Sequence, residues 1–421
     1  MPSLVLLRCP TILSLSLACL LSASSSIALA HGGPTFDLPE EVDAPPAAPP
    51  TADRDDTPMS LTEAAALPGA VNRMGTGTTL GGYGELHFNA VTPDGGDTST
   101  NLDLHRVVFF FGHDFGNGLR FYSELEIEHA FVEGAEGGEV ALEQAFVDWD
   151  LLGRAMTLRA GMVLVPMGLM NSAHNPPTFQ GVERPSVDKL IIPSTWREGG
   201  IGLVGQPTEG LRYELYLLGG LDPAGFSGSK GIRGGRQGLS NGVADGPAVT
   251  ARVAYEPILG LAIGLAGYYS ITGPNTDAVS SSVPVAGGAL DMRVKRSGIE
   301  LRAELAYLHV GDTAALRADT GSGPVSDVGS DLLGGYVEFG YDVLHSSSTR
   351  HALVPFARAE WYDTTLSESD PAFDTPSVFE LTMGATYRPI FQVAFKADVQ
   401  LRRPSSGRSE NIIDLGVGWM F

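Results

Sequence analysis

From about residue 78 to the end of the chain, apolar and polar positions alternate in steps of two. Within 299–309, Ile299, Leu301 and Leu305 fall on one face, and Glu300 and Glu304 fall on the other. A period of two is that of a β-strand with one apolar side, whereas a helix would scatter these charges around its circumference. The pattern therefore predicts strands, and the 53 glycines agree because glycine weakens helix interiors.

The connections between the predicted strands alternate in length, with short ones such as 116–118 and 207–209 and long ones such as 166–198 and 220–247. A soluble sandwich has no reason to place tight turns at one rim and long loops at the other. An outer-membrane barrel has short periplasmic turns, long external loops and an even number of strands. The sixteen predicted strands lie at about 78–90, 102–115, 119–131, 139–150, 155–165, 199–206, 210–219, 248–256, 260–271, 288–296, 298–310, 331–343, 352–363, 377–388, 390–403 and 411–421.

These features predict an all-β fold, a transmembrane antiparallel β-barrel of about 16 strands, over residues 76–421. Such a sheet has to close, because an open edge cannot be hydrated inside lipid. Aromatic residues such as Tyr255, Tyr307 and Trp361 fall on apolar faces, mostly near strand ends, where interfacial girdles occur. Phe421 is expected to close the last strand with its apolar face against lipid.

The first 75 residues have a different composition. Residues 1–30 match a secretory signal peptide, with Arg8, an apolar run and a small-residue cleavage site at Ala30. A membrane anchor and lipoprotein processing at Cys19 are the alternatives. Residues 31–75 are rich in Pro, Ala and acidic residues and predict an extended periplasmic linker. Cleavage would remove both cysteines, so disulfides and thiolate metal sites are not expected.

The charge pattern bears on partners and on the barrel interior. A formal net charge of −22 argues against nucleic acid, which is bound by clustered Lys and Arg. Arginines and carboxylates share the polar strand faces, so a hydrated lumen is expected in place of a solid hydrophobic core. Most of these charges are expected to pair across strands.

The connection with the most distinctive sequence is 166–198. It follows the fifth predicted strand and is the third external loop. Its prolines, its apolar "LIIP" and its tryptophan predict an ordered loop that folds into the bore and narrows it. Fixed positive charge at this constriction would suit phosphate or carboxylate groups. In the alternative, the cations pair with Glu183, Asp188 and Glu198 and only pin the loop. The candidate constriction and solute-binding residues are Arg159, Arg184, Lys189 and Arg197.

The same region resembles a known family. "EQAFVDWD", "LRAGMVLVPMGLMN", "PPTFQGVERP" and "IIPSTWREGGIGLVG" are similar to the porin O/P family, the phosphate-selective porins and their relatives. The resemblance covers roughly 78–421 and is sharp across 143–205. It implies a sixteen-stranded porin, usually a homotrimer, with the third loop as its constriction and an arginine ladder in phosphate-selective members.

Motifs for catalysis or metal binding are not evident in the sequence. His129, His174 and the other histidines are dispersed, and no nucleophile elbow or P-loop occurs. The glycine-rich, basic stretch 228–238 predicts a flexible external loop. No enzyme activity, catalytic residue, metal or cofactor is therefore predicted.

The predicted function is passive diffusion of small hydrophilic solutes or ions, with anions such as phosphate as candidates, through a porin in the bacterial outer membrane. Expected partners are membrane lipid, lipopolysaccharide and the solutes. The alternatives are a structural or adhesin-like barrel tethered to the cell wall by residues 31–75, and a barrel hydrolase. Planar-bilayer conductance separates the first alternative from a channel.

Overall fold

A computed structural model describes residues 72–74, 77–130, 138–240, 246–272, 282–318, 326–368 and 370–421. The predicted signal peptide and, apart from 72–74, the predicted linker lie outside these residues. The helices of the described residues are short, and none has the length and apolar character that crossing a membrane requires.

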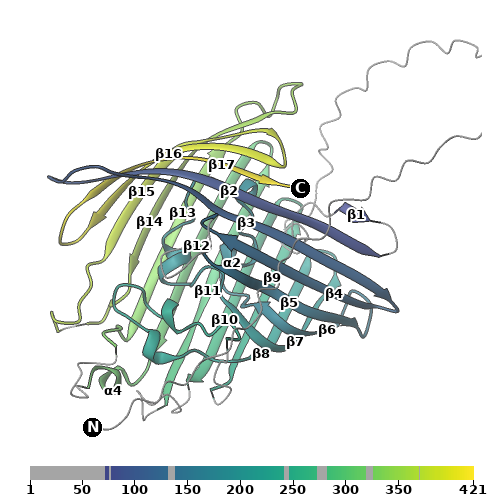
Figure 1. Ribbon diagram of the computed structural model, residues 1–421, viewed down its shortest axis with the longest axis horizontal. Coiled ribbons are helices and arrows are strands. Elements are labelled where there is room, and N and C mark those ends of the chain that lie inside the picture. The colour runs from purple at the N-terminus through teal and green to yellow at the C-terminus, as the bar shows by residue number, and fades with distance from the viewer. Residues whose placement is uncertain are drawn as a thin grey trace, which may run out of the picture. The chain divides into compact units, whose positions relative to one another are not determined.

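Sixteen strands of the described chain, β2 to β17, form one closed antiparallel sheet (Figure 1). Each strand pairs with its neighbours in the chain, and β17 closes the barrel by pairing with β2. A short strand, β1 (Asn72–Met74), pairs with the start of β2. The barrel strands are β2 (Thr78–Pro93), β3 (Ser99–Gly116), β4 (Leu119–Glu128), β5 (Val140–Asp150), β6 (Thr157–Leu164), β7 (Arg197–Thr208), β8 (Leu211–Leu218), β9 (Ala248–Ile258), β10 (Leu261–Thr272), β11 (Val283–Arg296), β12 (Ile299–Val310), β13 (Asp331–Tyr341), β14 (Ala352–Asp363), β15 (Val378–Ile390), β16 (Val393–Pro404) and β17 (Glu410–Met420).

All sixteen predicted strands are confirmed, but several extend beyond their apolar alternation. The ladder between β2 and β3 continues to the pair Val91 and Ser99, so the predicted long first loop shrinks to 94–98. Strand β11 likewise begins at Val283, opposite Thr272, and not at residue 288. Pairing with a neighbouring strand satisfies backbone hydrogen bonds even where the side-chain pattern is weak.

The two faces of the sheet have opposite character. Outward side chains such as Leu265 and Leu305 are 63% and 55% exposed, whereas the inward Glu304 is buried. The last residue completes the closure, because the backbone of Phe421 exchanges hydrogen bonds of 2.9 Å with that of Gly82. The Phe421 ring is half-exposed on the outer face and meets Phe109 edge-on. The predicted position of the terminal phenylalanine is confirmed.

The third loop, between β6 and β7, folds inside the barrel, as predicted. It contains α2 (Leu169–Ser172), the 3-10 turn η2 (Pro176–Thr178) and α3 (Val187–Leu190). Backbone N–H groups of the loop donate to carboxylates on the far wall: Leu169 to Glu304 at 2.7 Å, Val182 to Asp398 at 2.7 Å and Val187 to Glu360 at 3.3 Å.

The neck of the loop is closed by one side chain. The amide of Asn171 donates to the carbonyls of Val165 and Trp196 at 2.6 and 3.0 Å, and its oxygen accepts from the Trp196 N–H at 2.8 Å. These three bonds join the start of the loop to its end. Because such buried bonds leave backbone groups unpaired when broken, they favour one loop conformation.

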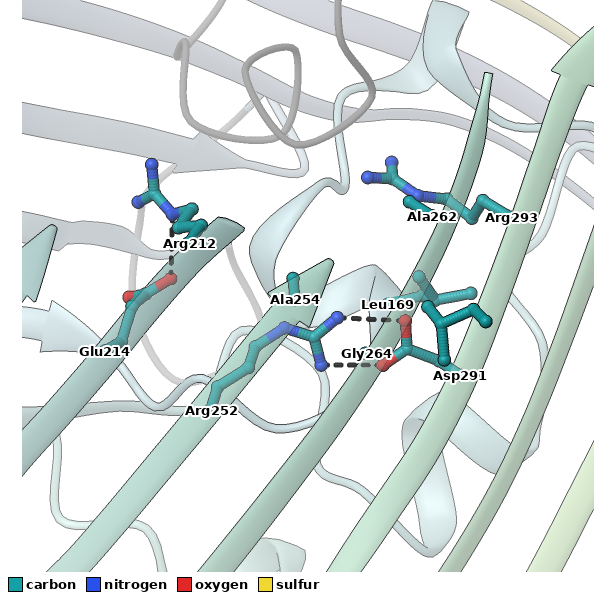
Figure 2. Close-up of a pocket in the computed structure, with 10 residues that line it drawn as sticks. Leu169, Arg212, Glu214, Arg252, Ala254, Ala262, Gly264, Asp291 and Arg293 are labelled. Atoms are coloured by element: carbon teal, nitrogen blue, oxygen red, sulfur yellow. Dashed lines mark hydrogen bonds and ion pairs between the residues drawn. The ribbon is translucent and has the colours of Figure 1, made fainter. Parts of the chain in front are cut away.

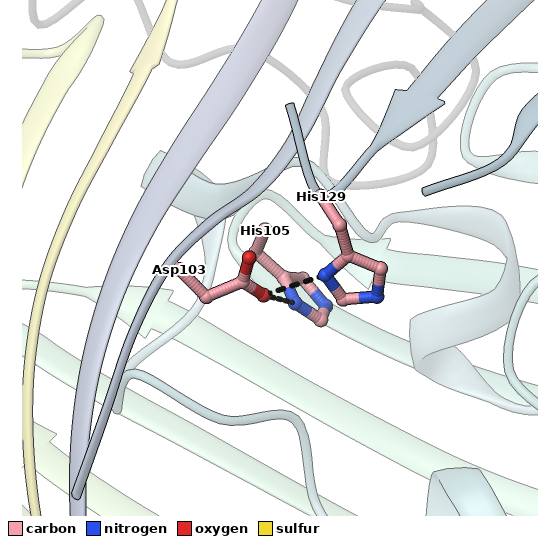
Figure 3. A group of neighbouring side chains, drawn as sticks. All are labelled: Asp103, His105 and His129. Atoms are coloured by element: carbon pink, nitrogen blue, oxygen red, sulfur yellow. Dashed lines mark hydrogen bonds and ion pairs between the residues drawn. The ribbon is translucent and has the colours of Figure 1, made fainter. Parts of the chain in front are cut away.

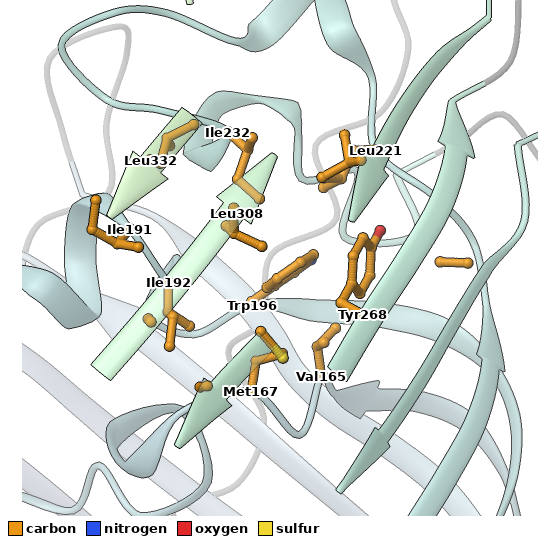
Figure 4. Packing of buried hydrophobic residues seen from close by; sticks show 14 of the residues in the cluster. Val165, Met167, Ile191, Ile192, Trp196, Leu221, Ile232, Tyr268, Leu308 and Leu332 are labelled. Carbon is orange, nitrogen blue, oxygen red and sulfur yellow. The ribbon is translucent and has the colours of Figure 1, made fainter. Parts of the chain in front are cut away.

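Part of the barrel interior is an apolar core, which corrects the prediction that a hydrated lumen takes the place of a hydrophobic core (Figure 4). Trp196 is fully buried, and its ring lies 4.7 Å from that of Tyr268. Ile232 lies in the glycine-rich stretch 228–238, between the 3-10 turns η3 (Pro223–Gly225) and η4 (Arg233–Gly235), and is also fully buried. The prediction of a flexible external loop there is wrong. The core also includes Val165, Met167, Ile191, Ile192, Leu221, Leu308 and Leu332.

Arginines attach the glycine-rich stretch to the third loop. Arg233 donates to the Ser194 hydroxyl at 3.0 Å, and Arg236 donates to the Ser194 carbonyl at 2.6 Å. Basic residues in a glycine-rich segment are ordinarily interpreted as solvated. Here they satisfy backbone and hydroxyl groups of an inward-folded neighbour.

Glycines on the inner face of β17 make room for the third loop. A Cβ added to Gly418 would lie 2.6 Å from Cβ of Pro176, and one added to Gly416 would lie 2.9 Å from the Val182 side chain. Both distances are shorter than van der Waals contact allows. The alternating glycines of the last strand therefore let the loop pack directly on the barrel wall.

Candidate pore and constriction

The inner wall carries many ion pairs, as expected for charges facing each other across strands. The fully buried Arg358 contacts Glu338 at 3.3 Å and Glu360 at 3.1 Å. Arg402 contacts Glu380 at 2.8 Å. Buried charges need such partners because their removal from water is costly. The prediction of cross-strand pairing is confirmed for Arg358 with Glu338 and for Arg402 with Glu380, whereas Arg358 and Glu360 both lie on β14.

A cavity that opens to solvent lies between the third loop and the wall formed by β8 to β11, with about 500 Å³ of empty space when the adjoining solvent is included (Figure 2). Leu169 from α2 lines it on the loop side. Arg212, Arg252 and Arg293 line it on the wall side, together with Glu214 and Asp291. Arg212 is the second residue of β8 and Arg293 lies near the end of β11, so the cavity is on the short-turn side of the barrel.

Within this set, three arginines face two carboxylates, an excess of one positive charge. Arg252 binds Asp291 through two parallel hydrogen bonds of 2.6 and 2.9 Å. Arg212 is closer to solvent and donates to Glu214 at 3.3 Å. An arginine-rich wall with a small cationic excess can attract oxyanions, since guanidinium groups bind them bidentately.

Gly264 makes room for the pair of Arg252 and Asp291, which crosses β10 above it. An added Cβ would lie 2.3 Å from Nη2 of Arg252 and 2.6 Å from either Asp291 oxygen. Any side chain at this position would have to separate the two charged groups. The glycine is therefore needed for the pair.

Replacing Gly264 with Ala is expected to open this pair and to lower the free energy of unfolding by about 1.5–3 kcal/mol, the usual value of a charged hydrogen bond. Gly267→Ala on the same strand is the control, because the nearest atom to an added Cβ there is 3.9 Å away. Denaturant unfolding of the detergent-folded barrel measures both. Equal losses for the two variants would contradict this role of Gly264.

The four constriction candidates predicted from the sequence are not brought into one site. Arg159 lies on β6, binds Asp148 bidentately at 2.7 and 2.8 Å, and stacks over the Phe146 ring. Lys189 on α3 binds Glu183 at 2.6 Å. The pinning alternative named Glu183 among the carboxylates that pair with these cations, and the Lys189 contact agrees with it.

Arg197 starts β7 and lies 4.0 Å from Glu139, which the pinning alternative did not name. Glu198 instead accepts the backbone N–H of Gln237 at 3.0 Å. The loop end is therefore held by the glycine-rich stretch.

Arg184 belongs to the third loop, and its side chain is enclosed between the loop and the barrel wall, with 6% of the residue exposed. Its Nε and Nη2 have no hydrogen-bond partner among the described residues. Burial lowers the pKa of Arg184, and the nearby charge of Arg106 lowers it further. A guanidinium placed in this way contributes to the field inside the barrel but does not face the cavity of Figure 2.

Three histidines that are dispersed in the sequence lie beside carboxylates in the structure, in two separate groups. His129 and His105 both lie near Asp103, whose Oδ2 is 2.8 Å from Nδ1 of His129 and 3.3 Å from Nδ1 of His105 (Figure 3). These are ordinary hydrogen-bond lengths, and His129 is exposed. The other group, His174 with Glu124 and Glu143, is buried.

Sequence reasoning placed Arg212, Arg252 and Arg293 on the polar strand faces but did not select them. All three lie in the part of the barrel near the short turns. Which residues of different strands lie close together there follows only from the strand register. Arg212 faces Ala254, and Arg293 faces Ala262, in neighbouring strand pairs near the short turns.

The barrel is similar in fold to outer-membrane porins of known structure. It matches Salmonella typhi OmpF in complex with daunomycin (TM-score 0.58, 14% identity) over 83% of this chain and 99% of that one. It matches an anion-selective porin from Comamonas acidovorans (TM-score 0.53, 14% identity) over 82% and 99%. The outer membrane channel DcaP of Acinetobacter baumannii (TM-score 0.53, 14% identity) matches over 84% and 100%. The fold thus defines a protein of the porin-like barrel class.

Sequence comparison gives a more specific relationship. An uncharacterized protein of Aquifex aeolicus (strain VF5) is 32% identical over 360 residues, which cover 82% of this chain and 80% of that protein. The chain belongs to the same family as this Aquifex aeolicus protein. No protein-family profile matches the chain.

Proposed function

We propose that the protein is an outer-membrane porin, a water-filled channel through which small hydrophilic solutes diffuse passively. One observation carries this proposal: a closed sixteen-stranded barrel with an apolar exterior has a charged interior, with a cavity between its inward-folded loop and an arginine-lined wall. An apolar exterior suits lipid, and a charged interior requires water. The similarity in fold to porins supports the same function.

Small oxyanions are the proposed preferred solutes, with phosphate as one candidate. The cavity has three arginines against two carboxylates, so the excess is small and the expected preference is weak. The resemblance to the porin O/P family supports phosphate, and the scarcity of lysine argues against a strong preference for it.

The test of channel function is conductance in planar lipid bilayers. The detergent-purified protein is expected to give stepwise current increases that rise with salt concentration. Heat-unfolded protein at the same concentration is the control. A folded barrel that inserts into bilayers without conductance would favour the structural or adhesin-like alternative.

Charge selectivity is tested with reversal potentials across a tenfold KCl gradient. Removing two of the three arginine charges of the cavity in Arg212→Gln/Arg293→Gln is expected to lower the chloride-to-potassium permeability ratio by roughly twofold, because fixed charge sets ion concentration in a pore. Arg184→Gln/Arg197→Gln is the matched variant for the residues selected from the sequence. A larger change in the second variant would move the selectivity site to the third loop.

We further propose a homotrimer in the bacterial outer membrane, in contact with lipopolysaccharide. The porin O/P resemblance supports the trimer. Mass measurement of the detergent-extracted protein, with the bound detergent subtracted, distinguishes a trimer from a monomer. Fractionation of inner and outer membranes tests the location.

A further inference from the structure

The group formed by Glu124, Glu143 and His174 joins the third loop to the barrel wall. Glu124 lies on β4, Glu143 on β5 and His174 between α2 and η2. One ligand atom of each lies within 4.8 Å of the others, and the three residues are 2%, 0% and 4% exposed. We propose that these three side chains bind a divalent metal ion, with zinc as the best fit, and that the ion fixes the loop to this wall.

The distances favour an ion over direct contact. Nε2 of His174 is 3.9 Å from Oε1 of Glu124 and 3.5 Å from Oε2 of Glu143. Charged N–H···O hydrogen bonds are shorter, about 2.7–2.9 Å. Ligand bonds of 2.0–2.2 Å in tetrahedral zinc sites place neighbouring ligand atoms about 3.4 Å apart. The spacing in this group is therefore closer to that around a metal ion.

Two atoms of the group are buried without a partner. Oε1 of Glu143 and Nε2 of His174 make no hydrogen bond in the part of the chain that the structure describes. Such atoms carry a large desolvation cost unless something binds them. Both residues are more than nine-tenths buried. A cation between the carboxylates and the imidazole would bind Nε2 of His174, with Oε2 of Glu143, 3.5 Å from that nitrogen, as the facing carboxylate oxygen.

The surrounding contacts orient the three ligands. Nδ1 of His174 lies 3.2 Å from the Asn171 carbonyl, which can only accept, so Nδ1 carries a proton and, in the neutral ring that binds a metal, the lone pair is on Nε2. The Gln144 amide donates to Oε2 of Glu124 at 2.6 Å and leaves Oε1 toward His174. The Tyr83 hydroxyl donates to Glu143 at 3.4 Å. Partners of this kind hold the ligands of metal sites in place.

The fold places Glu143 in this group through a β-bulge. In the pairing of β4 with β5, Glu124 is opposite Gln144 and Leu125 is opposite Leu142, so Glu143 is the extra residue. Bulges re-aim side chains, and this one adds a second carboxylate to the inner face beside Glu124.

The local charge also favours a divalent cation. Glu85, Glu124, Glu126 and Glu143 lie near Arg106 and Arg184, so carboxylates outnumber guanidiniums by two. Arg106 is already paired with Glu85 at 2.7 Å and with Glu126 at 3.2 Å. An ion of charge +2 balances the remainder.

A bound ion would hold the loop from a second side. The loop's N–H groups already bind carboxylates on β12, β14 and β16, whereas Glu124 and Glu143 belong to β4 and β5. The loop also contacts β2, where His87 lies 3.1 Å from Glu183. The metal would add a direct link from the loop to β4 and β5.

The experiment measures zinc binding by the complete, detergent-folded protein. After treatment with a chelator and addition of zinc, elemental analysis is expected to find one tightly held zinc per chain. His174→Ala and Glu143→Gln are each expected to weaken zinc binding by about 100-fold or more, since each removes a ligand. His129→Ala, in the exposed group of Figure 3, is the control and should retain the ion.

A second measurement needs no variant. Anomalous diffraction at the zinc edge from zinc-treated crystals should place the ion about 2.0–2.2 Å from Nε2 of His174. Absence of bound zinc, unchanged affinity in the folded His174→Ala protein, or loss of zinc only in His129→Ala would each overturn the proposal.

Discussion

Arg358→Met is expected to lower the free energy of unfolding by about 3–5 kcal/mol, the usual cost of removing one partner of a buried ion pair. Arg358 is fully buried on β14 and contacts Glu338 and Glu360 on the inner wall. Methionine fills much of the same volume but leaves Glu360 without the guanidinium that it contacts, and leaves Glu338 with Arg302 at 3.9 Å. Glu360 also accepts the backbone N–H of Val187 from the third loop, so the loss should extend to loop docking.

The control is the corresponding change at a solvated pair. Arg120 binds Asp150 at 2.6 Å, and its side chain is 41% exposed. Arg120→Met should cost no more than about 1 kcal/mol, as is usual for surface pairs. Denaturant unfolding in the same detergent measures both variants. Losses of equal size would show that water reaches Arg358 as readily as it reaches Arg120, and would contradict the burial of this ion pair.

Gly416→Val/Gly418→Val is expected to displace the third loop from β17 and to raise single-channel conductance roughly twofold, because conductance follows the open cross-section of a water-filled pore. The added side chains would occupy the positions of Val182 and Pro176. Overpacking costs about 1–3 kcal/mol at each site, and a moved loop relieves it more easily than a moved barrel strand does.

Gly267→Val controls for the effect of a bulkier residue on a strand, since an added Cβ there has space. Its conductance should equal that of the unmodified protein. Single-channel recordings at fixed salt and voltage provide the comparison. If the double glycine variant conducts normally while the folded barrel is retained, the loop does not limit the current.

The strands could be predicted because each needs only local information. The period of two fixes which residues share a face, and the alternation of short and long connections fixes the architecture. Ile299–Val310 and Glu410–Met420 illustrate this, since both were predicted to within one residue. Strand ends were less predictable, as with β11, because a neighbour's hydrogen bonds extend them beyond the apolar pattern.

The candidate site could be predicted only in part. The inward fold of the third loop followed from its length, prolines and apolar residues. The roles of its cations did not, because pairing depends on which strand faces the loop. Lys189 binds a residue six positions away, whereas Arg184 is enclosed among groups from β2, β3 and β5. The apolar core around Trp196 was missed because its members come from separate loops and strands that are each only weakly apolar.

The sequence by itself determined a two-faced sheet of sixteen strands with one long, ordered connection. The strands could be predicted because each one has its own alternation of apolar and polar side chains, which does not depend on the other strands. Only the tertiary structure decided which charges meet, where glycines admit the loop and that His174 lies against two glutamates. Those contacts depend on barrel closure and strand register, which bring together residues separated by tens to hundreds of positions in the chain.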